Sequence, residues 1–143
     1  MSARTRIEVL VKPGLYELQS LESSSRYYVD TRLGAAPRYL RVAGMDDSFW
    51  GRLDDLWQPL AQLVSVFPTW DGQRYLEAHE VDTEDVEAWT IRVGSRHVFT
   101  TPEPDPSRGR QYYWVKSSAC KAIRALDELP EALASRLAEA ERP

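Results

Sequence analysis

The sequence predicts an α+β fold in which an antiparallel sheet carries helices on one face. Three observations favour this class. Short segments such as residues 15–21 alternate apolar and polar side chains with the period of two that half-buried strands show. After Val42 the apolar spacing changes to that of an amphipathic helix. Polar or Pro- and Gly-containing turns separate the segments.

Three strands are expected in the first half of the chain, at residues 15–21, 26–31 and 38–42. The second of them is rich in aromatic and β-branched residues, which suit a pleated and half-buried surface. A serine-rich turn precedes it, and residues 34–37, with the sequence Gly-Ala-Ala-Pro, end it.

A helix is expected at residues 47–64, because the apolar residues there fall on one helical face. These residues are Phe49, Leu53, Leu56, Trp57, Leu60, Leu63 and Val64. Asp46 and Asp47 stand where an N-cap and a favourable negative charge belong. Pro59 either kinks this helix or begins a second one.

The second half repeats the pattern of strands followed by helices. Strands are expected at residues 88–93 and 96–101, joined by a type II′ hairpin at Gly94 and Ser95. A further strand is expected at 110–115. Helical spacing resumes from Ala119 to Leu126, and Pro130 predicts the start of a last helix.

The two halves resemble each other, which raises the possibility of two related βββα units at residues 7–66 and 86–141 within one domain of 143 residues. Residues 88–115 would then form a three-stranded meander related by approximate two-fold symmetry to residues 15–42. Duplication is one explanation of the similarity, and the chemistry common to hairpins is the other.

Composition and motifs predict a protein without catalysis, cofactor or metal site. The single Cys120 excludes an intramolecular disulfide and is expected to be a small core residue. His79 and His97 are the only histidines, and no triad order, phosphate loop or metal spacing accompanies them. No signal peptide or membrane-length apolar stretch is found, so a cytoplasmic protein with no membrane partner is expected.

Charge and aromatic residues predict a binding surface. Residues 1–43 carry seven Lys or Arg and four Asp or Glu, whereas residues 44–96 carry four and eleven. With Leu40, Val42 and Val115 directed to the core, alternation puts arginines and aromatic residues on the free sheet face. Such a face suits single-stranded DNA or RNA. The other interpretation is an ordinary exposed sheet face, which the net charge of −4 favours. The candidate residues are Arg26, Tyr28, Arg32, Tyr39, Arg41, Arg96, Arg110, Tyr112 and Trp114.

A family resemblance points the same way. Residues 26–32, with the sequence Arg-Tyr-Tyr-Val-Asp-Thr-Arg, and residues 38–42, with the sequence Arg-Tyr-Leu-Arg-Val, resemble the PUR repeat of the purine-rich-element-binding proteins. The resemblance covers about residues 26–60. It implies paired ββββα units that bind single-stranded nucleic acid on the sheet face. Carried over by position, it implies binding roles for Arg26, Tyr28, Arg32, Tyr39 and Arg41. The fourth strand of the repeat has no counterpart before Phe49, and Pro37 replaces the glycine of the family.

The acidic central segment predicts a different partner. Asp82, Glu84, Asp85 and Glu87 would cover a basic protein, as an immunity or inhibitor protein does. The small size and the negative net charge fit this alternative. The cluster lacks the glycine and the ligand spacing of a calcium loop, so a solvated helix start is expected there. The sequence leaves the oligomeric state open.

Overall fold

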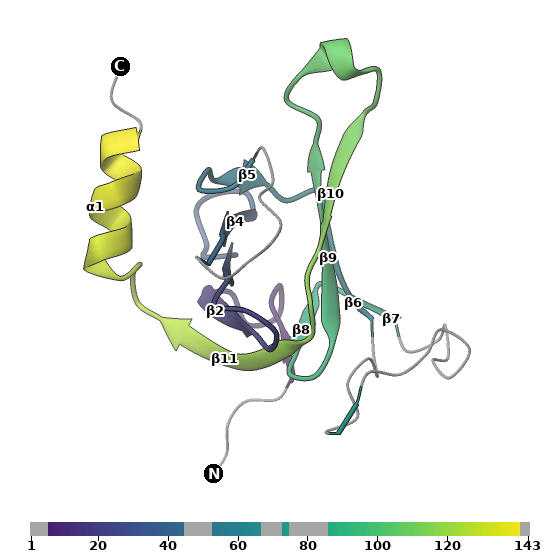
Figure 1. The fold of residues 1–143 in the computed structure, drawn as a ribbon, viewed down its shortest axis with the longest axis vertical. Helices are drawn as coiled ribbons and strands as arrows, with labels where there is room; N and C mark the ends of the chain where they lie inside the picture. The colour runs from purple at the N-terminus through teal and green to yellow at the C-terminus, as the bar shows by residue number, and fades with distance from the viewer. Residues whose placement is uncertain (1–5, 45–52, 67–72, 75–85, 141–143) are drawn as a thin grey trace.

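The structure, a computed structural model, describes residues 6–44, 53–66, 73–74 and 86–140, apart from the side chains of residues 139 and 140 (Figure 1). These residues form a mostly β fold, which corrects the predicted α+β class. The strands are β1 (Arg6–Glu8), β2 (Leu15–Ser20), β3 (Arg26–Asp30), β4 (Arg38–Val42), β5 (Gln58–Pro59), β6 (Gln62–Val66), β7 (Val86–Ala88), β8 (Thr90–Arg92), β9 (Arg96–Pro102), β10 (Tyr112–Lys116) and β11 (Cys120–Leu126). The helical elements are the 3₁₀ turn η3 (Pro106–Arg108) and the α-helix α1 (Glu131–Ala140).

The first sheet has five antiparallel strands in the order β11-β2-β3-β4-β5. Strands β2, β3 and β4 confirm the three strands predicted for the first half of the chain. Leu18 of β2 lies opposite Tyr27 of β3, and Tyr28 lies opposite Leu40 of β4. Because residues in register share a face, Leu18 and Tyr27 are on one face of the sheet, and Tyr28 and Leu40 are on the other.

The second sheet has four antiparallel strands in the order β10-β9-β6-β7, and β1 and β8 form a separate two-stranded ladder. Strands β9 and β10 form a long hairpin that projects beyond the rest of the molecule, with η3 at its tip (Figure 1). Asp105 caps η3 by accepting a hydrogen bond from the Ser107 backbone N–H at 3.0 Å. Gly109 ends it with a left-handed φ of 70°.

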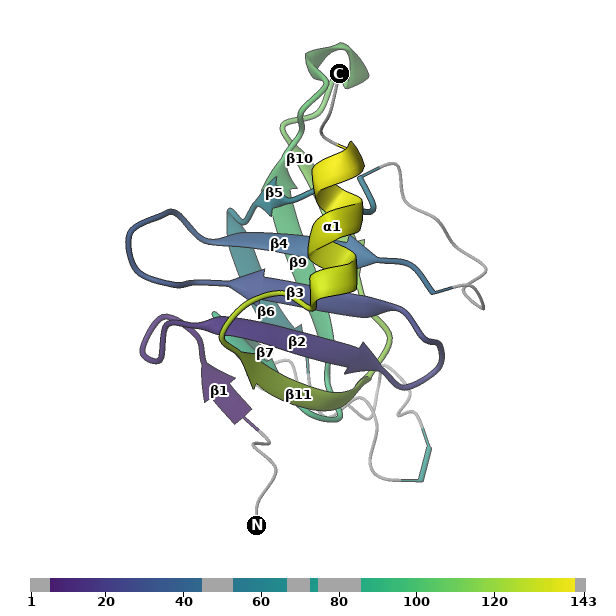
Figure 2. The same ribbon diagram turned by 90° about the vertical axis from the view of Figure 1, so that its left-hand side faces the viewer.

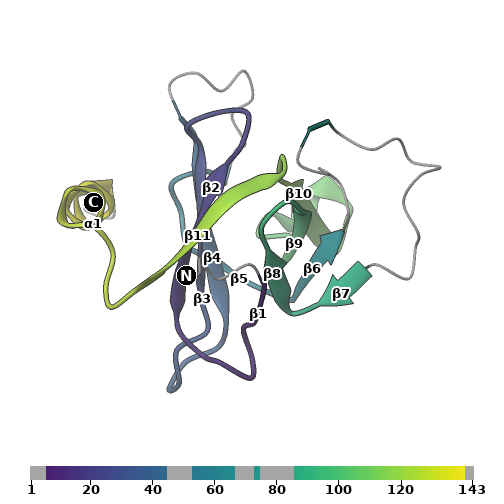
Figure 3. The same ribbon diagram turned by 90° about the horizontal axis from the view of Figure 1, so that it is seen from below.

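The main core lies between the two sheets. Figure 3 shows the molecule as three layers, with the second sheet on one side of the first and α1 on the other. Phe99 of β9 stacks on both Tyr27 and Tyr39, with ring centroids 5.0 Å apart in each pair. Leu63 of β6 and Val29 of β3 are fully buried in the same cluster. The aromatic residues of the predicted strands therefore hold the two sheets together.

Helix α1 covers the opposite face of the first sheet, where it lies across β3 and β4 (Figure 2). Leu137 packs with Tyr28 and Leu40, and Leu133 adds to this second cluster. Pro130 directly precedes the helix and accepts the Ala134 backbone N–H at 2.9 Å, as predicted for a helix that starts there. No helix in the described residues is long and apolar enough to cross a membrane.

The predicted helix at residues 47–64 is wrong where the structure describes it. Residues 53–55 form a turn, and β5 and β6 follow. Asp55 has a φ of 64°, which is outside helical geometry. Pro59 is tolerated because β5 is the edge strand of its sheet, where a missing N–H breaks no ladder. In β6, Leu63 and Ser65 are buried at alternate positions, as in a strand. The apolar spacing that predicted one helix therefore arises from a turn followed by two strands. The expected cap at Asp46 and Asp47 lies outside the described residues.

Two further predictions for the second half are wrong. Residues 120–126 form the edge strand β11, which pairs with β2 instead of forming a helix. The expected meander at residues 88–115 does not form, because β8 pairs with β1 while β9 pairs with β6 and β10. The turn at Gly94 thus joins strands of different sheets. The strand order differs from that of residues 15–42, so the internal similarity reflects common strand chemistry and not two βββα units.

Candidate binding surface

Two residues that were expected on a free sheet face are in the core. Tyr39 is 1% exposed and stacks on Phe99. Arg41 is buried on the same face, where it forms an ion pair with Asp54 and donates through Nε to the Tyr27 hydroxyl at 3.1 Å. The prediction that Tyr39 and Arg41 point outward is wrong, because the second sheet covers the face that was expected to be free.

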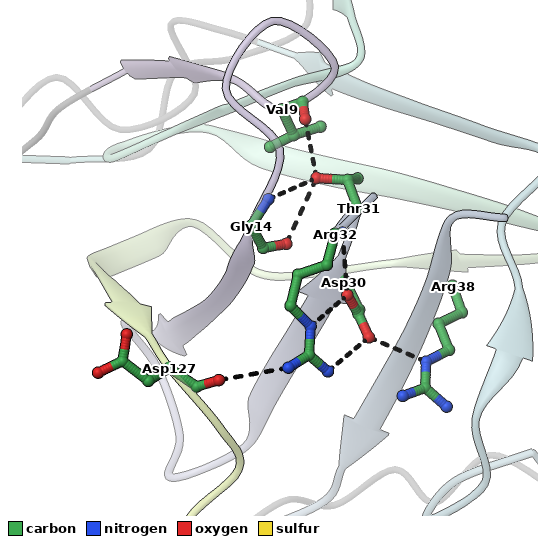
Figure 4. A network of polar contacts seen from close by, with 7 residues as sticks. All are labelled: Val9, Gly14, Asp30, Thr31, Arg32, Arg38 and Asp127. Carbon is green, nitrogen blue, oxygen red and sulfur yellow. Dashed lines mark hydrogen bonds and ion pairs between the residues drawn. The ribbon is translucent and has the colours of Figure 1, made fainter. Parts of the chain in front are cut away.

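Arg32 belongs to a network that ties strand ends together (Figure 4). Its Nε and Nη2 atoms donate to the two oxygens of Asp30, each at 3.0 Å, and its Nη1 donates to the Asp127 carbonyl at 3.3 Å. Arg38 donates to Asp30 at 3.1 Å and stacks over the Trp57 ring at 3.9 Å. Burial would raise the pKa of Asp30, but the hydrogen bonds from Arg32 and Arg38 outweigh it and hold this pKa below its usual value.

Arg26 and Tyr28 lie on the face that α1 covers. Tyr28 is buried and donates its hydroxyl to Glu17 Oε2 at 2.9 Å. Burial, and next the hydrogen bond to Glu17, raise the pKa of Tyr28 well above its ordinary value. Arg26 and Arg124 both form ion pairs with Glu17. Sequence reasoning missed Glu17 and Arg124, because β2, β3 and β11 bring them together and no local pattern marks them.

The remaining candidates of the central region are half-buried or lie outside the description. Arg96 is half-buried on β9, opposite Val66 of β6. Glu87 forms ion pairs with Arg6 and with Arg92. The side-chain hydrogen bond from Arg6 lowers the pKa of Glu87. Asp82, Glu84 and Asp85 lie outside the described residues.

Arg110, Tyr112 and Trp114 are exposed, as the alternation with the buried Val115 predicts. Tyr112 is 41% exposed and Trp114 is 56% exposed; in the described part of the chain they are the exposed aromatic side chains. Their ring centroids are 6.4 Å apart with planes tilted by 51°. The alternation continues to Lys116, which is also exposed and which the sequence could have nominated. We call Arg110, Tyr112, Trp114 and Lys116 the β10 stripe.

The position of β10 explains why this stripe reaches solvent. β10 ends the order of the second sheet, and within residues 6–44, 53–66, 73–74 and 86–140 no strand pairs with its outer edge. Tyr113 and Val115 point to the core between the sheets, so Tyr112 and Trp114 point away from it. Register places half-buried Val98 and Val64 in a row with Lys116 on the same outer face. The stripe therefore borders an apolar sheet surface.

The cations near the stripe are largely compensated. Arg110 lies 3.6 Å from Glu103, and Arg108 lies 3.7 Å from Asp105. Residues 103–116 contain three cations and two carboxylates, a surplus of one positive charge. The local surface is thus aromatic and close to neutral.

Two groups that could carry chemistry are buried. Burial lowers the pKa of His97 to about 3 and raises the pKa of Cys120 to about 12. At neutral pH the imidazole is therefore uncharged and the thiol is protonated. His97 Nε2 accepts the Arg92 backbone N–H at 3.0 Å, a structural contact. Among the described side chains, no group of three or more His, Cys, Asp or Glu is placed to hold a metal ion.

Comparison of the chain with protein-family models, with curated proteins and with solved structures finds no match.

Proposed function

We propose that this protein is a non-catalytic binding module that recognises another protein through Tyr112 and Trp114. The observation that supports this is the exposure of two adjacent aromatic rings on a projecting edge strand. Tyr and Trp are enriched among the residues that dominate binding energy at protein interfaces. Large aromatic side chains gain much from being covered and lose little conformational entropy when they are fixed.

The open edge of β10 favours a partner that presents an extended segment. An edge strand offers unpaired backbone groups, and a strand added there gains main-chain hydrogen bonds while side chains at alternate positions give specificity. Such a segment would run beside the β10 stripe and cover both rings. Val98 and Val64 would extend the apolar part of the contact area.

Single-stranded nucleic acid is the second candidate, because two aromatic rings of the β10 stripe lie between two cations, Arg110 and Lys116, and sites that stack bases combine these residue types. Charge favours the protein partner. Even if each of the three cations in residues 103–116 contacted one phosphate, the salt slope for a single strand would be about 2, whereas binders that contact many phosphates show much steeper slopes. The net charge of −4 opposes general phosphate affinity as well.

The acidic-segment alternative has less support on the described surface. Glu87 is engaged by two arginines, so presenting its carboxylate to a basic partner would first require breaking these ion pairs. The proposal therefore uses the β10 stripe rather than Glu87 as the contact surface.

A capture and affinity experiment tests the proposal. The full chain and three variants, Trp114→Ala, Tyr112→Ala and Leu33→Ala, are immobilised and exposed to a lysate of the source cells. Leu33 is the matched control, because it is 87% exposed and lies in the β3–β4 connection. We expect a protein that the wild type and Leu33→Ala retain and that Trp114→Ala loses. With the purified partner, Trp114→Ala should then weaken binding by about 2 kcal/mol or more, roughly thirtyfold.

Titration with a labelled 20-nucleotide oligothymidine separates the two candidates. Weak binding with a shallow salt dependence is the expected result. Tight binding with a steep salt dependence, weakened by Arg110→Ala and by Lys116→Ala, would show that the stripe binds a nucleic acid instead of a protein. A protein retained equally by Trp114→Ala would show that the stripe is not the contact surface.

A further inference from the structure

A groove lies between α1 and the outer face of the first sheet, away from the β10 stripe. Its volume is ≈ 550 Å³, within the range of about 300–1,000 Å³ that small-molecule sites show. Its wall on the sheet is polar, with Glu17, Tyr28, Arg26 and Arg124. Such a combination of one large hollow with a few converging polar groups is typical of a ligand site.

The polar wall has more positive charge than its one carboxylate neutralises. Glu17 is 2% exposed and accepts the Tyr28 hydroxyl at 2.9 Å. Arg124 Nη2 lies 3.2 Å and Arg26 Nη1 lies 3.5 Å from Glu17 Oε1. Two guanidinium groups thus share one buried carboxylate, and each contacts it through a single nitrogen. Their side chains are 60% and 41% exposed, so further N–H groups can reach a ligand in the groove.

The opposite wall is mainly apolar. It consists of Ala132 and Leu133 from the start of α1 with Pro130 directly before it, and Val42 of β4 adds an apolar side chain on the sheet beside Arg26. Arg136 also lines the groove, but Asp55 engages it at 3.1 Å. A ligand that fits both walls carries negative charge at one end and an apolar body at the other.

We propose that this groove binds a small organic anion, whose carboxylate or phosphate contacts Arg26 and Arg124 and whose apolar body lies against α1. Planar guanidinium groups match the oxygens of both anions. Glu17 fixes the two arginines in the groove, and the Tyr28 hydroxyl holds Glu17 in place. This site is separate from the surface proposed for the protein partner, so either can fail without the other.

Calorimetric titration of the full chain with three probes tests the charge requirement. The probes are octanoate, octyl phosphate and octanol, which share one apolar chain. We expect at least one anion to bind about tenfold or more tightly than octanol, and the tighter of the two anions identifies the headgroup. Equal binding of octanol, or binding of none of the three, would overturn the proposal.

Two substitutions with opposite effects test the geometry. Arg124→Gln should weaken binding of the preferred anion by about tenfold or more, because a charge-assisted contact is lost. Glu17→Gln should strengthen it, because the two arginines are then uncompensated. Arg108→Gln, at the tip of the β9–β10 hairpin, is the matched control and should change nothing. Affinity unchanged by Arg124→Gln would show that the anion binds elsewhere. That variant changes a largely exposed side chain and is expected to fold.

Discussion

The hairpins β3–β4 and β9–β10 are built from similar residues and have different surroundings. Each contains tyrosine, arginine and β-branched residues. β3 and β4 have strand neighbours on both sides, with the second sheet on one face and α1 on the other, so Tyr39 and Arg41 are buried. Among the residues that the structure describes, β10 is the last strand of its sheet and is covered on one face, so Tyr112 and Trp114 reach solvent. Position within the sheets, more than composition, decides whether an aromatic strand is core or surface.

The largest expected contrast is between two tyrosines. Tyr39→Ala should lower the free energy of unfolding by about 4 kcal/mol, because it removes a buried ring and its stacking on Phe99. Tyr112→Ala should change it by about 0.5 kcal/mol, since the residue is 41% exposed and lies outside the core. Urea unfolding of both variants measures the difference. Similar losses for the two would mean that the β9–β10 face is covered in solution.

The second contrast concerns two arginines. Arg41→Ala should lower the free energy of unfolding by about 3 kcal/mol, because Asp54 would remain as an uncompensated carboxylate in a buried environment. Arg108→Ala should lower it by less than about 1 kcal/mol, since both side chains of its ion pair with Asp105 are 46% exposed. The double change Arg41→Met with Asp54→Leu should recover much of the lost stability. If the double variant is as unstable as Arg41→Ala, the uncompensated carboxylate of Asp54 is not the cause of the lost stability.

These contrasts show what the sequence could predict. The strands at 26–31 and 38–42 and the helix after Pro130 follow from local period and capping. The outward direction of Tyr112 and Trp114 followed from the buried Val115. The same rule failed at Tyr39, because alternation identifies two faces and does not say whether both are covered.

The pairing of distant elements was beyond local patterns. Helical spacing relates Leu56, Trp57 and Leu60, yet these residues flank the edge strand β5, whose partner β4 lies earlier in the chain. The partner of Arg41, Asp54, lies in the turn at residues 53–55, which precedes β5. The groove is assembled from β2, β3, β4, β11 and α1, elements that span more than a hundred residues. Such a site can be predicted only when the order of the strands in the sheet is known.

The third prediction uses pH to examine the covered face of β9. His97 is fully buried, and burial lowers its pKa to about 3. The unfolded chain therefore binds a proton near pH 6.5 that the folded chain does not bind. This contribution to stability is complete above pH 6.5 and decreases as pH falls toward 3, with about 2 kcal/mol lost by pH 5. His97→Gln should show a flatter profile between pH 7 and pH 5. An unchanged profile would mean that the imidazole takes up its proton in the folded protein.

The smallest expected changes in stability come from replacing a glycine in the connection of each hairpin. Gly34 follows β3 with a φ of 100°, and Gly109 precedes β10 with a φ of 70°; a Cβ at either would meet nothing within 4 Å. Substitution therefore tests backbone conformation alone. Asparagine adopts the left-handed region near a φ of about 60° more readily than other residues with side chains. Gly109→Asn should thus cost about 0.5 kcal/mol or less. Gly34→Asn should cost about 1–2 kcal/mol, because its φ lies further from that region. Thermal unfolding of both variants measures the difference, and an equal cost at the two sites would show that the β3–β4 connection relaxes to accept the side chain.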